Sequence, residues 1–128
     1  MSENEVVENM RNVLIILFVA IFLFMVGMTI LTSLRAPLFA AGGVHPDVKA
    51  QFHASPWAVA TLYDAYFGFI TFFCWVAYKE KIILARIVWF LLIMALGNIA
   101  MSFYVLMQLF RLKRDEPLSH LFLNADAK

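Results

Sequence analysis

The chain has 128 residues, of which 63% are hydrophobic and 15% charged, and its formal net charge is +1. Water-soluble domains average about 45–50% apolar and about 25% charged residues, so this composition excludes an ordinary soluble domain. The near-neutral charge also provides no basic surface for nucleic acid. The single cysteine, Cys74, cannot form an internal disulfide or a paired-cysteine metal site.

Three apolar segments predict an all-α integral membrane protein with a single membrane domain over residues 1–128. They cover residues 13–34, 57–78 and 87–110. Each meets the roughly 20 residues that a helix needs to cross about 30 Å of hydrocarbon, and in lipid a helix satisfies its own backbone groups. The residues before the first segment are acidic, whereas the leader of a signal peptide is basic. We therefore interpret all three segments as transmembrane helices.

The connections predict a long loop between the first two helices and a short turn between the last two. Within the loop, residues 35–56, "HPDVKAQFH" is compatible with a short helix that has Pro46 at its first position. Ser55 and Pro56 are typical of an N-cap and a first helical residue, so we place the start of the second helix there. After the third segment, "PLSHLFL" predicts either a short interfacial helix or a frayed end.

Three crossings would place the N-terminus and the 79–86 turn on one side of the membrane. The long loop with His45 and His53 and the C-terminal tail with His120 would share the other side, so all three histidines would lie there. Basic residues near the spans are slightly more numerous on this second side. The positive-inside rule therefore favours a multi-pass protein with a cytoplasmic C-terminus.

Asp64 is a carboxylate inside the second apolar segment. Polar and small residues recur around it at spacings of three and four, and we call this set the polar face: Thr61, Asp64, Gly68, Thr71, Trp75 and Tyr78. Small residues let helix backbones approach and hydroxyls can hydrogen-bond across a contact, so we predict that this face contacts protein. A charged, unpaired carboxylate at this depth costs about 2.5–3.5 kcal/mol on insertion scales. Asp64 therefore needs a partner or a proton.

Asn98 in the third segment lies at a similar depth to Asp64. At 1.5 Å per residue, the two lie about 10 and about 12 Å below the long-loop interface, and Thr29 and either Tyr63 or Tyr104 reach the same layer. We predict a ligand- or partner-binding site from these candidates: Asp64, Asn98, Thr61, Ser102, Tyr63 and His53. Two interpretations remain open. Asp64 and Asn98 form a hydrogen bond that fixes helix packing, or the layer binds a ligand, a proton or a partner subunit.

Signatures of catalysis and metal binding are weak. His45 and His53 do not have the i, i+4 spacing of a helical zinc pair, so we predict no metal site. The sequence contains no nucleophile motif, phosphate-binding loop or paired-acid motif, and it indicates no particular cofactor. These features favour a protein that is not an enzyme.

Residues 55–110 resemble a family of small multi-pass membrane proteins grouped as a domain of unknown function. The shared pattern is Ser-Pro-Trp, then an aspartate, then Trp-x-x-Tyr-Lys-Glu, here Ser55, Pro56, Trp57, Asp64, Trp75, Tyr78, Lys79 and Glu80. The resemblance implies a membrane protein and no particular activity. It also marks the Lys79-Glu80 end of the second helix as worth testing.

Two functions agree with these features. The first is an accessory, structural or assembly subunit of a larger membrane complex. The alternative is a membrane-embedded binder of, or enzyme on, a lipid or isoprenoid-like molecule, with Asp64 as its acid or base. We expect the partners to be membrane lipids and other membrane proteins or further copies of the chain, and we expect no nucleic acid.

Overall fold

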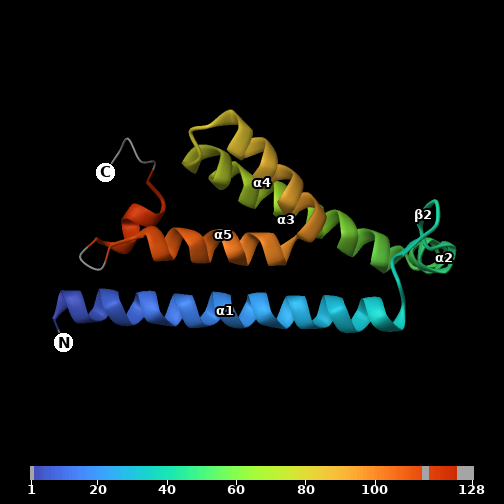
Figure 1. Cartoon of the computed structure of the whole chain (residues 1–128), viewed down its shortest axis with the longest axis horizontal. Helices are drawn as coiled ribbons and strands as arrows, with labels where there is room; N and C mark the ends of the chain where they lie inside the picture. Colours follow the sequence, from blue (N-terminus) through green and yellow to red (C-terminus); the bar gives the residue numbers. More distant parts are fainter. Residues whose placement is uncertain (1, 114–115, 124–128) are drawn as a thin grey trace.

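A computed structural model describes residues 2–113 and 116–123, and helices make up most of it (Figure 1). The α-helices of these residues are α1 (Glu3–Arg35), α2 (Pro46–Ala54), α3 (Pro56–Lys79), α4 (Ile83–Leu96) and α5 (Asn98–Arg111). An antiparallel pair of two-residue strands and one 3₁₀ turn accompany them: β1 (Phe39–Ala40), β2 (Gly43–Val44) and η1 (Leu118–Leu121).

α1 is longer than the predicted apolar span, because the acidic residues before the span are helical too. The helix begins with a capping box. The Glu5 N–H donates to Ser2 Oγ at 3.4 Å, and the Ser2 N–H donates to Glu5 Oε2 at 2.8 Å. Its 33 residues give a length of about 50 Å. None of these residues is buried, so the apolar part of α1, residues 13–34, remains partly or fully exposed.

α2 and α3 begin where the sequence predicts. Pro46 is the first residue of α2, and His45 Nδ1 accepts a hydrogen bond from the Asp47 N–H at 3.4 Å. Ser55 Oγ accepts from the Ala58 N–H at 3.3 Å and caps α3. The sequence does not predict the β1–β2 hairpin, which closes the loop between α1 and α2.

The structure corrects the predicted third span. Residues 87–110 are not one helix, because the chain turns back at Gly97 and forms two antiparallel helices of 14 residues, α4 and α5. The Trp89 ring centroid lies 6.4 Å from that of Phe103, whereas these residues would be about 21 Å apart in one continuous helix. Each helix is about 21 Å long, which is too short to cross about 30 Å of hydrocarbon alone. The structure therefore does not confirm a third spanning helix, and α1 and α3 are the two helices of the described residues that are long and apolar enough to cross a membrane.

Gly97 makes this turn possible. Its φ is 54°, a conformation that L side chains rarely adopt, and its N–H donates to the Ile93 carbonyl at 2.8 Å to close α4. A Cβ at this position would lie 2.7 Å from Cζ of Phe69 on α3. The ring of Phe69 therefore covers the turn, and any larger residue would displace it.

Two clusters of buried residues hold the helices together. Between α3 and the α4–α5 hairpin, the first contains Val76, Ile93, Ala100 and Tyr104. The second joins α5 and η1 to the first half of α1, and its members and their neighbours are Val105, Leu109, Leu121, Leu14, Ile15 and Phe18. α5 therefore lies along the N-terminal half of α1.

The structure places the C-terminal η1 and the loop between α1 and α2 at opposite ends of the molecule, whereas the sequence predicts that they share one side. Because α5 runs antiparallel to α1, its last residues and η1 lie near the N-terminus, while α2 lies at the other end (Figure 1). Lys79 Nζ, at the end of α3, donates to the Leu123 carbonyl at 3.0 Å, which places the α3–α4 turn at this same end. His120 of η1 is therefore at the opposite end from His45 and His53. This corrects the expectation that all three histidines share one side.

Candidate functional site

The polar face of α3 points mostly away from the rest of the described chain. All of its members are exposed except Trp75, which is half-buried. α3 contacts the hairpin through a different side, formed by Phe69, Phe72, Phe73 and Val76. Apart from Trp75, the polar face therefore makes no substantial contact with the described part of its own chain.

Asp64 and Asn98 do not meet. Both side chains are exposed, and no hydrogen bond or ion pair of Asp64 is formed with any residue that the structure describes. Asn98 is the first residue of α5, and its carbonyl accepts a hydrogen bond from Ser102 Oγ at 2.7 Å. The interpretation of Asp64 as half of an internal packing bond has no support in this geometry. A carboxylate instead projects from the outer side of an apolar helix.

The two threonines of the polar face donate their hydroxyl protons to their own helix. Thr61 Oγ1 donates to the Trp57 carbonyl at 2.8 Å, and Thr71 Oγ1 donates to the Phe67 carbonyl at 2.9 Å. A hydroxyl oxygen that has donated its proton can still accept. Together with the Asp64 carboxylate, the polar face therefore offers hydrogen-bond acceptors to whatever covers it.

The remaining candidates lie elsewhere. Ser102 is 2% exposed within α5, and its hydroxyl donates to the backbone carbonyls of Asn98 and Ile99 in the preceding turn. Tyr63 is 64% exposed on α3, and His53 is exposed on α2. The structure thus brings Thr61 and Asp64 onto one face, but it does not assemble all six candidates into a single site.

A contact that the sequence did not predict joins Tyr104 to Glu80. The Tyr104 hydroxyl donates to Glu80 Oε1 at 3.0 Å, and the tyrosine is fully buried. The rings of Phe72, Trp75 and Trp89 surround it with centroid distances of 6.2, 5.5 and 4.8 Å. The interaction ties the end of α3 to α5. The resemblance had marked Glu80, but nothing in the sequence connects it with a residue 24 positions away.

Arg86 also binds Glu80, at the turn between α3 and α4. Its Nε donates to the Glu80 carbonyl at 2.7 Å, so the turn between α3 and α4 is held by a side chain of α4. With the Tyr104 bond, this gives Glu80 partners on both helices of the hairpin. We interpret the Lys79-Glu80 end as a structural clamp for the hairpin.

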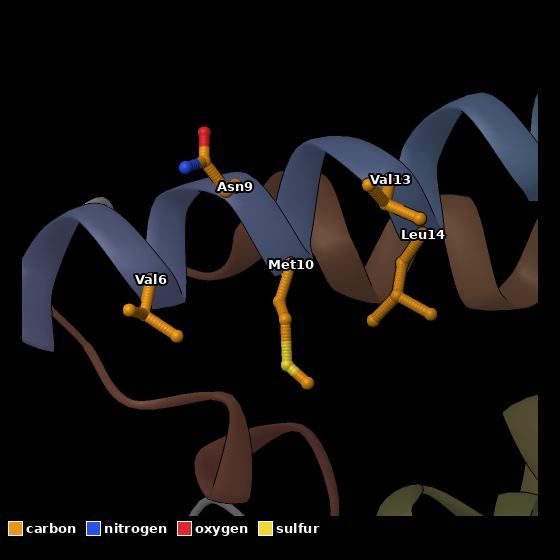
Figure 2. A pocket seen from close by; sticks show the side chains of 5 residues that line it. All are labelled: Val6, Asn9, Met10, Val13 and Leu14. Carbon is orange, nitrogen blue, oxygen red and sulfur yellow. The ribbon is translucent and has the colours of Figure 1, made fainter. Parts of the chain in front are cut away.

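Two shallow hollows lie along α1. The first, of about 300 Å³, is lined by Val6, Asn9, Met10, Val13 and Leu14, and Figure 2 shows Val6, Met10 and Leu14 turned to one side while Asn9 is turned away. The second, of about 480 Å³, lies where the end of α1 meets α2. The lining of neither hollow includes Asp64. They therefore do not support a small-molecule site at this carboxylate.

Within residues 2–113 and 116–123, no three side chains of histidine, cysteine, aspartate or glutamate lie together as metal ligands. His45 Nδ1 lies 3.6 Å from Asp47 Oδ2, a local contact at the start of α2. This pair alone does not complete a ligand set for a metal ion.

These features define a mostly helical protein in which α1 and α3 are long and apolar enough to cross a membrane. The chain belongs to the family described as "Protein of unknown function (DUF1475)", whose profile matches residues 9–128. The match extends well beyond residues 55–110, on which the resemblance was based. No curated protein and no solved structure matches the chain.

Proposed function

We propose that the protein spans a membrane with α1 and α3 and acts as an accessory or assembly subunit of a larger membrane complex. The observation that carries this proposal is the exposed carboxylate of Asp64 on the outer side of α3. In lipid, an unpaired charge at this position would cost about 2.5–3.5 kcal/mol, and a partner protein would remove that cost.

The exposure of the two long helices supports a membrane environment. In the most apolar window of α1 no residue is buried within the structure, and in that of α3 6% are. Burial of apolar surface away from water is favourable by about 25 cal/mol per Å². Helices that are this apolar and this exposed therefore gain stability when lipid or other apolar helices cover them.

The polar face supports assembly over a small-molecule activity. Intramembrane carboxylates almost always face protein or a water-filled cavity, and here neither hollow includes Asp64. A partner helix would cover both the carboxylate and the neighbouring small residue, Gly68. Neither of the two hollows in the described part of the chain provides a site at Asp64 for the alternative function, a lipid or isoprenoid-like ligand.

Gentle detergent extraction of the full-length protein from its own membranes tests the proposal. We expect the protein to migrate in a complex well above its own mass of 14.7 kDa, and mass analysis of the complex to identify the other subunits. Recovery as a stable monomer that turns over an added lipid substrate would instead favour the alternative.

A further inference from the structure

The polar face of α3 also indicates the chemistry of its partner. We infer that it binds a membrane-spanning helix of another protein, and that this helix carries a lysine or arginine at the depth of Asp64. The inference rests on the proposed function, because it names the kind of subunit that the exposed face would recruit.

Charge complementarity selects a cationic partner. Asp64 lies about 10 Å along α3 from Trp57, well inside the apolar segment. Carboxylates within membranes are paired with opposite charges or with backbone groups, so a basic side chain at the same depth is the natural complement. Acceptors also dominate around Asp64, since the Thr61 hydroxyl has donated its proton to the Trp57 carbonyl. Lysine and arginine are the positively charged side chains that carry donors and no acceptor at neutral pH.

A second copy of this chain cannot supply such a group. The apolar segments 13–34, 57–78 and 87–110 contain no lysine, arginine or histidine. Two copies of α3 related by a two-fold axis would bring their Asp64 carboxylates towards each other, and like charges repel. The partner must therefore be a different chain.

Gly68 provides an independent indication that a helix docks here. It lies one turn beyond Asp64 on the polar face, and a Cβ at this position would meet no atom within 4 Å. Packing within the described chain thus does not require a glycine at this position, in contrast to Gly97. In membranes, small residues allow another helix to approach closely. The first part of α3 extends beyond the α4–α5 hairpin, which leaves room for that approach (Figure 1).

A defined peptide tests the charge preference. The full-length protein would be reconstituted in phosphatidylcholine vesicles with a donor dye on Cys74, its single cysteine, which is exposed. The acceptor would be carried by a leucine–alanine transmembrane peptide with one arginine about 10 Å from one interface. A matched peptide has leucine in place of arginine. We expect energy transfer to report at least tenfold tighter association with the arginine peptide.

Two variants assign this preference to the polar face. Asp64→Asn keeps the shape of the side chain and should abolish the difference between the peptides. Gly68→Leu should weaken binding of both peptides at least fivefold, while Gly27→Leu on α1, where a Cβ also meets nothing within 4 Å, should leave binding unchanged. Circular dichroism of each variant checks that the helices are retained.

Each contrary result has a distinct meaning. Equal binding of the two peptides, or a preference that survives Asp64→Asn, would overturn the cationic partner while leaving assembly by α3 intact. Energy transfer between labelled copies of the protein that disappears with Gly68→Leu would show that a second copy covers the face, and would also overturn the inference. The proposed function itself fails only if the native protein is a monomer.

Discussion

At Gly97 the backbone has a φ of 54°, and a Cβ would lie 2.7 Å from the ring of Phe69. We therefore expect Gly97→Ala to destabilise the protein by about 1–3 kcal/mol, because alanine is strained in this conformation and its methyl group would displace the ring. The free energy of unfolding can be measured by titrating the detergent-solubilised protein with a denaturing detergent and monitoring helix content by circular dichroism.

Gly27→Ala is the matched control, since Gly27 lies inside α1 and a Cβ there meets nothing within 4 Å. This change should stabilise the protein or leave it unaltered. Adding Phe69→Ala to Gly97→Ala should relieve the clash but not the backbone strain. If Gly97→Ala were as stable as the original protein, the turn would not depend on glycine.

The Tyr104–Glu80 hydrogen bond gives a second prediction at the scale of single residues. Tyr104→Phe removes the donor from a fully buried site and leaves Glu80 Oε1 without it. We expect a loss of about 1–3 kcal/mol, because a hydrogen bond to a carboxylate is stronger than one between neutral groups. The same unfolding assay applies. Tyr63→Phe, at a side chain that is 64% exposed, should change stability by less than about 0.5 kcal/mol.

At the scale of elements, local signals were sufficient to place the helix starts. Pro46 and Ser55 lie where α2 and α3 begin, because caps and first-turn prolines act over a few residues. The capping box of Ser2 and Glu5 could also have been read from the sequence, since it follows the S-x-x-E pattern.

The break at Gly97 could not be placed in the same way. A glycine inside an apolar run costs only about 1 kcal/mol relative to alanine, so helix propensity allows both a continuous helix and a turn. The choice depends on contacts between distant residues, above all Phe69 with Gly97 and Trp89 with Tyr104. The outward orientation of Asp64 has the same origin, because the aromatic side of α3 is used to hold the hairpin.

The hairpin itself is open to a cross-linking test. With Cys74 replaced by serine, cysteines at Trp89 and Phe103 should be joined by a short bifunctional thiol reagent, since their ring centroids are 6.4 Å apart. In a continuous helix the two positions would be about 21 Å apart and could not be linked. Cysteines at Trp57 and Phe103 should remain unlinked in the hairpin, which controls for reaction between molecules.

At the scale of the whole molecule, two long helices are combined with a hairpin that returns to its starting side. The Phe22–Phe103 ring contact, at 6.1 Å, fixes the register of α5 on α1. Because α5 is antiparallel to α1 and Gly97 lies six residues before Phe103, this register places the Gly97 turn near Met28, beyond the middle of the apolar part of α1. Irregular backbone at membrane depth is tolerated where it is buried in protein. Gly97 meets this condition, because it is buried and covered by Phe69.

This arrangement predicts a membrane topology with two crossings. In this topology α1 and α3 would each cross once, while α4 and α5 would enter and leave on the side where α1 begins. Glu3 and Ser119 should therefore share one side, and Lys49 should lie on the other. Single cysteines at these three exposed positions, in a Cys74→Ser background, would be treated with a membrane-impermeant maleimide in sealed vesicles and then in permeabilised ones. We expect Glu3→Cys and Ser119→Cys to have the same accessibility to the reagent in sealed vesicles. Lys49→Cys should have the opposite accessibility, and all three should be labelled after permeabilisation. A third complete crossing by residues 87–110 would instead place position 119 with position 49, and that result would show that the hairpin does not persist in the membrane.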